Sequence, residues 1–464
     1  GWGLLAGAVC FAALLAWIVR FGVLPFLLLV LLEAAFIGAF VAGLAAWGTR
    51  PWRPLVAAVW WVAVEVARSS WPFGGLPWGQ LGLTQHDGGP LLPLARTLGV
   101  YGVSLACAAV AVCVEEAWQR LRRRERRGWR SLVVALRTPA LALVVVLAVA
   151  VVAGGSPPPA TGRRLDVAAV QGNARDLPPG GAARDDLARI ERVVDQMVAA
   201  TAPLADAEPP DLTVWPENAL DADPRENPEL AAKVDTALGY IDGSPFIVGG
   251  IFTGPRQETF FNAVARLDSD GDLVEVHHKR KLVPFGEYVP LRAWLSWYPA
   301  IEQIPRDGVT GDEPTVFAID GARVAPVTCF ESIFGDLVRD QVRNGAELLV
   351  VMTNNASFGR TAASAQHLAF SRVRAVESGR WVLHAGISGI SAVVDPHGRS
   401  SQETELFERT IVRADLPLVA QPTPFVRLGD LVGRGSLALS GLGLLWLAAS
   451  ARRRRRMAPP QTAG

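Results

Sequence analysis

Long apolar runs at both ends of the chain enclose a central region in which apolar stretches are short and alternate with polar residues. Six runs approach the roughly 20 apolar residues that a helix needs to cross a bilayer core. They lie at 2–19, 22–47, 51–67, 94–117, 138–154 and 431–450. These runs are too many, and most are too long, for a cleavable signal peptide. The pattern predicts a polytopic α-helical membrane domain, with buried core helices of a soluble protein as the alternative.

Between 165 and 418 the apolar runs have the length of strands, and amphipathic helices separate some of them. Three such helices carry their first apolar positions at Leu187, Phe334 and Ala365. Strands mixed with covering helices indicate a layered α/β domain. The runs predicted as strands are LDVAAVQ, DLTVWPE, FIVGGIF, FFNAVARL, DLVEVHHK, RVAPVTCF, ELLVVMTN, WVLHAGIS and SAVVDP.

These patterns divide the chain into four parts. Residues 1–155 hold at least five N-terminal membrane helices, 156–430 form the globular domain, 431–450 form a last membrane helix and 451–464 a basic tail. The first residue is Gly1 and no initiator Met is present. We therefore expect that the sequence is truncated at its N-terminus and that the number of spans is a minimum.

Arginine-rich segments next to the spans orient the chain in the membrane. QRLRRRERRGWR at 119–130 and ARRRRR at 451–456 are densely basic, and Arg50 and Arg53 lie in another short connection. Basic loops stay on the cytoplasmic side, and all three segments agree with one topology. That topology places the globular domain outside the cytoplasm. A nucleic-acid role is the weaker explanation, because the basic runs are short and flank spans.

Composition agrees with this division. The chain is 50% hydrophobic and 19% charged, with a mean hydropathy of +0.26, whereas soluble domains contain about 25% charged residues. Its net charge of +1 gives no bias toward nucleic acid. The loop 69–90 contains Trp71, Phe73 and Trp78 among Gly and Pro. It is either an interfacial segment at the depth of lipid headgroups or a plain connecting loop.

Cys329 is the single cysteine of the globular region, and no disulfide framework fits the four cysteines of the chain. It ends a predicted strand and directly precedes the helix expected from about Ser332. A thiol at a helix N-terminus has a lowered pKa, which favours the thiolate nucleophile. A buried structural cysteine is the alternative.

Two further polar residues end predicted strands. Only three of the 45 basic residues are Lys, so a Lys at a strand end suggests a compact charge that Arg cannot replace. Lys279 ends one strand and Glu217 ends another, where a carboxylate with a raised pKa can act as general base. Taken singly, either residue could be ordinary surface charge. Taken with Cys329, they form a set at the carboxyl ends of strands, where α/β sites form.

These residues lie in segments that resemble the nitrilase, or carbon–nitrogen hydrolase, superfamily. The resemblance covers 165–418 through TVWPEN, HHKRKLVPFGEYVP, VTCFES and TNNASFG. It implies a four-layer α-β-β-α sandwich in which Glu217 is the general base, Lys279 stabilises the oxyanion and Cys329 is the nucleophile. Lys279 rather than Lys281 matches because it stands three residues before Leu282. The resemblance also assigns supporting roles to three further residues, Glu287, Glu331 and Asn262.

With spans on both sides, the whole chain resembles the apolipoprotein N-acyltransferase family. The resemblance implies transfer of an acyl chain from a membrane phospholipid, through a Cys thioester, to the diacylglyceryl-cysteine of an apolipoprotein. We expect a monomer in the bacterial plasma membrane with an extracytoplasmic catalytic domain and with no metal, cofactor or nucleic acid. Trp78, Phe285 and Phe330 are predicted to face the lipid substrates. The larger number of spans in the family implies that further spans precede Gly1.

Two other functions share these features. A membrane-tethered nitrilase-type amidase has the same three catalytic residues but uses water as the acceptor and needs no array of spans. A catalytically inactive nitrilase-like scaffold needs neither Glu217, Lys279 nor Cys329, so their joint presence argues against it.

Overall fold

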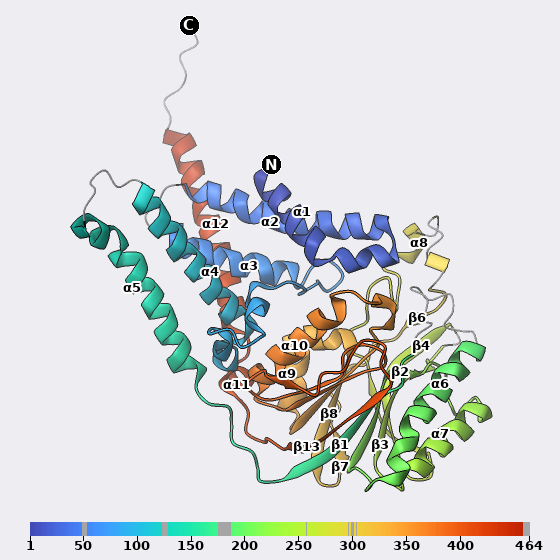
Figure 1. The fold of residues 1–464 in the computed structure, drawn as a ribbon. Helices are drawn as coiled ribbons and strands as arrows, with labels where there is room; N and C mark the ends of the chain where they lie inside the picture. The colour runs from blue at the N-terminus through green and yellow to red at the C-terminus, as the bar shows by residue number, and fades with distance from the viewer. Residues whose placement is uncertain are drawn as a thin grey trace.

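The computed structural model describes residues 1–48, 53–122, 129–174, 187–256, 258–295, 297, 301–302 and 304–457. Helices gather on one side of the molecule and two β-sheets on the other (Figure 1). Arg50, residues 123–128 of the basic loop at 119–130, and 458–464 of the tail lie outside the described residues. The first residues of the tail, from Ala451 to Met457, continue the last helix.

Six long helices form the helical region within these described ranges. Four of them are long and apolar enough to cross a membrane, and they coincide with the predicted spans at 22–47, 94–117, 138–154 and 431–450. The other two, with 13 and 16 residues, are shorter than a bilayer core requires. The six are α1 (Trp2–Leu14), α2 (Val23–Trp47), α3 (Arg53–Arg68), α4 (Ala95–Arg122), α5 (Trp129–Gly154) and α12 (Leu431–Met457).

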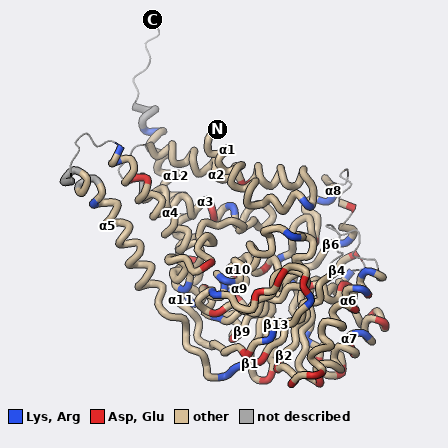
Figure 2. The backbone as a smooth tube through the Cα atoms, viewed as in Figure 1, with Lys and Arg blue, Asp and Glu red and all other residues tan. Residues whose placement is uncertain are grey.

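The outer surface of these helices is apolar. Leu28 on α2, Val152 on α5 and Leu445 on α12 are 59%, 82% and 68% exposed, and Figure 2 shows few charged residues along these helices. Exposed apolar surface costs about 25 cal/mol per Å² in water and nothing in hydrocarbon. The helical region is therefore built for a bilayer, and the chain is a membrane protein.

Two sheets form the globular region, and each has a parallel centre. In the first sheet, with the order β13-β1-β2-β3-β4-β5, strands β1 to β3 are parallel and β6 pairs with β4. Its strands are β1 (Arg164–Gln171), β2 (Leu212–Leu220), β3 (Phe246–Thr253), β4 (Thr259–Leu267), β5 (Leu273–His278), β6 (Asp307–Gly308) and β13 (Thr410–Pro417).

The second sheet has the order β12-β11-β10-β9-β8-β7, and β8 to β10 are parallel. Its strands are β7 (Phe317–Ile319), β8 (Ala322–Thr328), β9 (Leu348–Thr353), β10 (Val382–Gly386), β11 (Ala392–Val394) and β12 (Ser400–Ser401).

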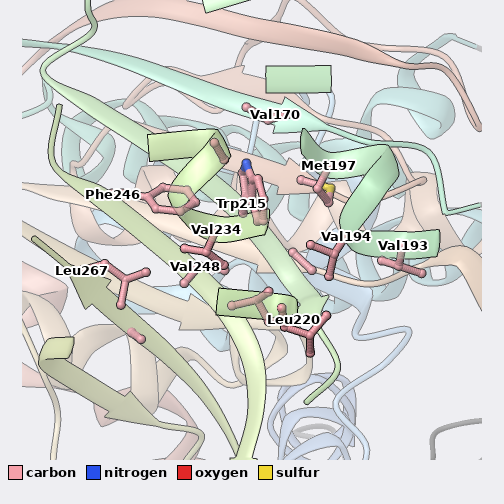
Figure 3. Packing of buried hydrophobic residues seen from close by; sticks show 14 of the residues in the cluster. Val170, Val193, Val194, Met197, Trp215, Leu220, Val234, Phe246, Val248 and Leu267 are labelled. Carbon is pink, nitrogen blue, oxygen red and sulfur yellow. The ribbon is translucent and has the colours of Figure 1, made fainter. Parts of the chain in front are cut away.

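Three apolar layers hold the sheets and helices together as the predicted four-layer α-β-β-α sandwich. Val167 and Val214 of the first sheet share one buried cluster with Val350 of the second, so the two sheets pack face to face. Trp215 and Met197 belong to a second cluster between the first sheet and its helices, α6 (Leu187–Thr201) and α7 (Pro228–Tyr240) (Figure 3). A third cluster joins the other sheet to α9 (Gly335–Arg343) and α10 (Ala363–Ser378). Two short helices, α8 (Arg292–Leu295) and α11 (Pro424–Leu428), complete the domain.

All nine predicted strands are present, and the three predicted helices correspond to α6, α9 and α10. Strand β13 and helix α7 were not predicted. β13 is an edge strand paired only with β1, and charged residues such as Arg413 and Asp415 interrupt its apolar positions. Edge strands bury less of their surface, so their sequence pattern is weaker.

Helix α10 lies between the second sheet and the helical region (Figure 1) and is hydrogen-bonded to both. Its Glu377 accepts a hydrogen bond of 2.7 Å from the Val100 N–H of α4. This N–H follows Gly99, whose φ of +69° breaks the regular helix, so the carboxylate satisfies a backbone group that the kink leaves free. Glu377 also forms an ion pair with Arg374.

Candidate active site

The three residues predicted to be catalytic come together where the carboxyl ends of β2, β5 and β8 meet between the sheets. Cys329 directly follows β8, and Lys279 directly follows β5. Glu217 lies inside β2 rather than at its end, at an irregularity in the pairing with β3 between Trp215 and Leu220. A bulge re-aims side chains, and here it accompanies a carboxylate that is 3% exposed.

The backbone at Cys329 is held in an uncommon conformation. Its φ of +46° lies in the left-handed region, which costs a residue with a Cβ of order 1 kcal/mol. Glu331 fixes the turn that follows, the 3₁₀ helix η7 (Cys329–Ile333), because its carboxylate accepts from the backbone N–H of Thr328. The sharp turn from strand to helix leaves the thiol partly accessible.

Lys279 lies between two buried carboxylates. Its Nζ is 2.9 Å from Oε1 of Glu217 and 2.9 Å from Oε1 of Glu287. Asn262 of β4 donates to the same two oxygens, at 2.8 and 2.5 Å. The second oxygen of Glu217 accepts from the backbone N–H of Asn354 at 2.9 Å. Glu217, Asn262, Lys279 and Glu287 thus form one hydrogen-bonded cluster, in which contacts with the described residues use two of the three ammonium protons of Lys279.

Charge pairing decides the protonation of this cluster. Burial by itself raises the pKa of Glu217, but the Lys279 ammonium and the hydrogen bonds from Lys279 and Asn262 outweigh it, so the net pKa is lowered below the usual 4.5. The predicted raised pKa of Glu217 is therefore wrong. Burial opposes the charged form of Lys279 as well, yet Glu217 and Glu287 raise its pKa. Both residues are charged at neutral pH.

The pKa of the Cys329 thiol is also opposite to the predicted shift. Burial and the neighbouring Glu217 carboxylate raise it well above the usual 9.0, and Lys279 offsets this only in part. The expected helix dipole is weak, because the helix that begins at Cys329 is a 3₁₀ turn of five residues. The thiol is therefore protonated at rest, and the neighbouring Glu217 carboxylate can accept its proton.

Glu331 joins the segment of the nucleophile to the segment of the lysine. One oxygen accepts from the N–H of Thr328 at 2.7 Å, and the other accepts from the N–H of Arg280 at 2.6 Å. These backbone groups directly precede Cys329 and directly follow Lys279. The imidazole of His277 lies 3.2 Å from the same carboxylate and contributes to lowering the pKa of Glu331, against the effect of burial. Glu331 therefore fixes the distance between the two segments.

The three predicted lipid-facing residues differ in exposure. Trp78 is only 4% exposed, because its Nε1 donates to Gln366 of α10 at 2.8 Å and its ring packs on Phe370. It anchors the loop 69–90 to the domain, and its contact with the lipid substrates stays a prediction. Phe330 is partly buried against Phe334, whereas Phe285 is 49% exposed and meets Phe73 edge to face.

Two contacts of the site leave no signal that the sequence patterns could reveal. The N–H of Asn354 is a backbone group, which no side-chain pattern shows, although it lies within the quoted TNNASFG segment. His367 of α10 is buried, with Nε2 3.1 Å from the carbonyl oxygen of Cys329 and 2.9 Å from the hydroxyl of Ser332. Burial lowers the pKa of His367 to about 4, so it is a neutral support for the turn.

A thiol, a carboxylate able to take its proton and an ammonium with one free donor are the groups needed for acyl transfer through a thioester. Residues 166–421 match the family model of the carbon–nitrogen hydrolases, and residues 1–113 match that of the apolipoprotein N-acyltransferase N-terminal domain. The fold and the first match define the class: a carbon–nitrogen hydrolase domain joined to membrane helices.

Curated relatives narrow the class. A protein of Mycolicibacterium smegmatis is 35% identical over 97% of this chain and 77% of its own length. Relatives from Geobacter metallireducens and Shewanella oneidensis are both 30% identical over 90% and 94% of this chain and 78% and 85% of their own. All three are named apolipoprotein N-acyltransferase. The chain belongs to the apolipoprotein N-acyltransferase family.

Among solved structures, the chain is similar to an amidase from Nesterenkonia sp.. The identity is 21%, the match covers 57% of this chain and 93% of that one, and the TM-score is 0.40.

Proposed function

We propose that the chain is an acyltransferase that moves an acyl chain from a membrane phospholipid to the N-terminal diacylglyceryl-cysteine of an apolipoprotein. Family membership over nearly the whole chain supports the acyl transfer, and the match of the helical region favours it over amide hydrolysis. The observation that carries the site assignment is Lys279, whose ammonium lies 2.9 Å from each of two carboxylates beside the Cys329 thiol.

In the first half-reaction Cys329 Sγ attacks the carbonyl carbon of the phospholipid ester, and Glu217 takes the thiol proton. The third proton of the Lys279 ammonium binds the oxyanion that forms. When the tetrahedral intermediate collapses, the ester C–O bond breaks and Glu217 returns the proton to the leaving alkoxide. A lysophospholipid departs, and the acyl chain remains as a thioester.

In the second half-reaction the α-amine of the acceptor attacks the thioester carbon. Glu217 takes a proton from the amine, and Lys279 again binds the oxyanion. Collapse breaks the C–S bond, the sulfur regains a proton from Glu217, and an amide is released. Two substrates that use one site in succession produce ping-pong kinetics.

Membrane attachment suits both substrates. Each carries acyl chains whose transfer to water costs about 0.8 kcal/mol per CH₂, so a soluble enzyme would have to extract them. A site next to apolar helices meets them in the bilayer. Because the cluster of Glu217, Lys279 and Cys329 comes from one chain, a monomer is sufficient.

We further propose that residues 156–430 form the catalytic domain and lie outside the cytoplasm. The C-terminal end of α4, with Arg120 and Arg122, and the C-terminal end of α12 lie on the side of the helical region away from the sheets (Figure 1). Both are rich in Arg, which favours the cytoplasmic face for that side. Cysteine labelling with a membrane-impermeant reagent in intact cells, at an added exposed cysteine such as Asp270→Cys, tests this orientation.

The reaction is tested by incubating the purified protein with phospholipid and a diacylglyceryl-cysteine peptide. We expect release of lysophospholipid and an N-acylated peptide, both absent in Cys329→Ala. Release of ammonia from small amides without lysophospholipid would support the amidase instead, and turnover of either kind excludes an inactive scaffold.

A further inference from the structure

Lys281 lies two residues after the catalytic Lys279. Its ammonium is located where the helical region meets η7, the turn that begins at Cys329. Its Nζ is 4.8 Å from the ring centroid of Phe334, just after that turn. On the other side it touches Gly74 in the loop that follows α3. A Cβ built on Gly74 would lie 2.1 Å from this Nζ, and the φ of +89° at Gly74 also favours glycine there.

Lys281 differs from the other two lysines in its charged partners. Lys279 has two carboxylates, and Lys233 pairs with Asp195 at 2.6 Å. Within the part of the chain that the structure describes, no carboxylate lies within 4.0 Å of Lys281 Nζ. Half-burial lowers its pKa, and the more distant Asp336 opposes this. Among the described residues, Lys281 is thus a partly desolvated cation without a paired carboxylate.

Two aromatic rings connect this cation to the residue that follows Cys329. The ring of Phe334 packs edge to face on Phe330 at 5.2 Å between centroids, and Phe330 follows Cys329 in the chain. A glycerophospholipid has matching chemistry, because its phosphate and its ester carbonyl are joined through the glycerol carbons. An ammonium is a point charge that binds phosphate oxygens without needing the planar geometry of Arg.

We propose that Lys281 binds the phosphate of the phospholipid donor and so directs its ester toward Cys329. The proposal rests on the proposed function and adds the residue that recognises the donor. The lysophospholipid that leaves carries the phosphate away, and the acceptor has none. Lys281 therefore acts in formation of the thioester and not in transfer of the acyl chain from it.

The test compares Lys281→Met, which keeps the length of the side chain and removes its charge, with Lys233→Met as the matched control. Formation of the thioester is measured in detergent micelles with phosphatidylglycerol and with diacylglycerol carrying the same acyl chains. We expect Lys281→Met to lose about 10- to 100-fold in kcat/KM with phosphatidylglycerol, the scale of a hydrogen bond to a charged group. The kcat/KM of Lys281→Met with diacylglycerol and its rate of acyl transfer from a preformed thioester should equal those of the wild type. Lys233→Met should equal the wild type with both donors.

Equal losses of Lys281→Met with both donors would show a structural role and overturn the proposal, as would no loss with either. If Lys281→Met does not fold, the wild type still decides: it must react faster with phosphatidylglycerol than with diacylglycerol, and equal rates contradict the proposal. A wild type that forms no thioester with any lipid would instead refute the proposed function.

Discussion

The protein has two buried charge networks, one at the catalytic cluster and one at the junction with the membrane helices. They differ in the hydrogen-bond donors that remain available for a ligand. At the cluster, Lys279 binds two carboxylates and keeps one proton for a ligand. At the junction, Arg374 donates to Glu377 and to the carbonyl oxygens of Ser332 and Ile333. Glu377 is held in turn by Val100 of α4.

This difference indicates that the cluster carries out the chemistry and that the junction positions the segment of the nucleophile. The cluster can exchange a proton and bind an oxyanion because its members are not saturated. The junction pairs Arg374 with the Glu377 carboxylate and with backbone carbonyl oxygens of the turn after Cys329, so it holds that turn in place. Substitutions at the cluster should therefore change rate more than stability, and substitutions at the junction the reverse.

Lys279→Met is expected to have the largest effect. It removes the oxyanion donor, which is worth about 10²- to 10³-fold in rate, and leaves Glu217 and Glu287 to repel each other. One of the two carboxyls then takes up a proton near neutral pH. Stopped-flow acylation by phospholipid measures the loss. Less than a tenfold loss would show that Lys279 is not the oxyanion donor.

The pH dependence of acylation distinguishes a thiol that Glu217 deprotonates from a cysteine that reacts only after it ionises by itself. Glu217 has a lowered pKa and must be deprotonated to act, so the rate should stay level from neutral pH until below the usual 4.5 and then fall about tenfold per pH unit. The Cys329 thiol has a pKa raised well above the usual 9.0, so no increase in rate is expected near that pH. The rate is measured with a soluble ester donor, so that titration of lipid headgroups does not affect the profile. A rise in rate between about pH 8 and 9, where an ordinary thiol titrates, would contradict the assignment of Glu217 as the base that deprotonates Cys329.

Glu377→Gln should sharpen the contrast from the junction side. It leaves the Arg374 guanidinium buried without its counter-charge, and breaking a buried pair costs up to about 3–5 kcal/mol of stability. The amide can still accept from the Val100 N–H, so the rate should fall less than tenfold, a drop of about 1.4 kcal/mol. Thermal unfolding in detergent and kcat are measured together. Unchanged stability with a hundredfold lower kcat would reverse the assignment of the two networks.

Arg164→Ala provides the smallest effect and the baseline. Arg164 pairs with Asp415 across β1 and β13, and both side chains are about half exposed. Exposed pairs contribute about 0–1 kcal/mol, so the midpoint of thermal unfolding should shift by at most a few degrees and kcat should not change. A larger loss of activity would mean that the first sheet transmits strain to the site.

The sequence predicts the strands and the residues of the cluster because both leave local signals. Buried strands such as β9 are continuous apolar runs, Glu217 and Cys329 follow apolar stretches, and Lys279 follows the shorter alternating pattern of β5. The protonation states were predicted wrongly because they depend on neighbours from other strands. No local pattern shows that Lys279 and Asn262 surround Glu217, or that Glu217 faces the thiol.

For a similar reason, the burial of Trp78 against α10 was not predicted. Its surroundings in the sequence are aromatic and rich in Gly and Pro, as in an interfacial segment. Its actual partner, Gln366, lies 288 residues away on α10. Likewise, the role of Glu377 depends on the kink at Gly99, which the apolar run 94–117 does not reveal.

The most direct test of the account is the covalent state of Cys329. Intact-mass spectrometry of the protein after incubation with phospholipid should show the added mass of one acyl group, sensitive to hydroxylamine and absent in Cys329→Ala. Addition of a diacylglyceryl-cysteine peptide should remove this mass and produce the N-acyl peptide in equal amount. Product formation by a wild type that never carries the acyl group, or by Cys329→Ala, would contradict the thioester route.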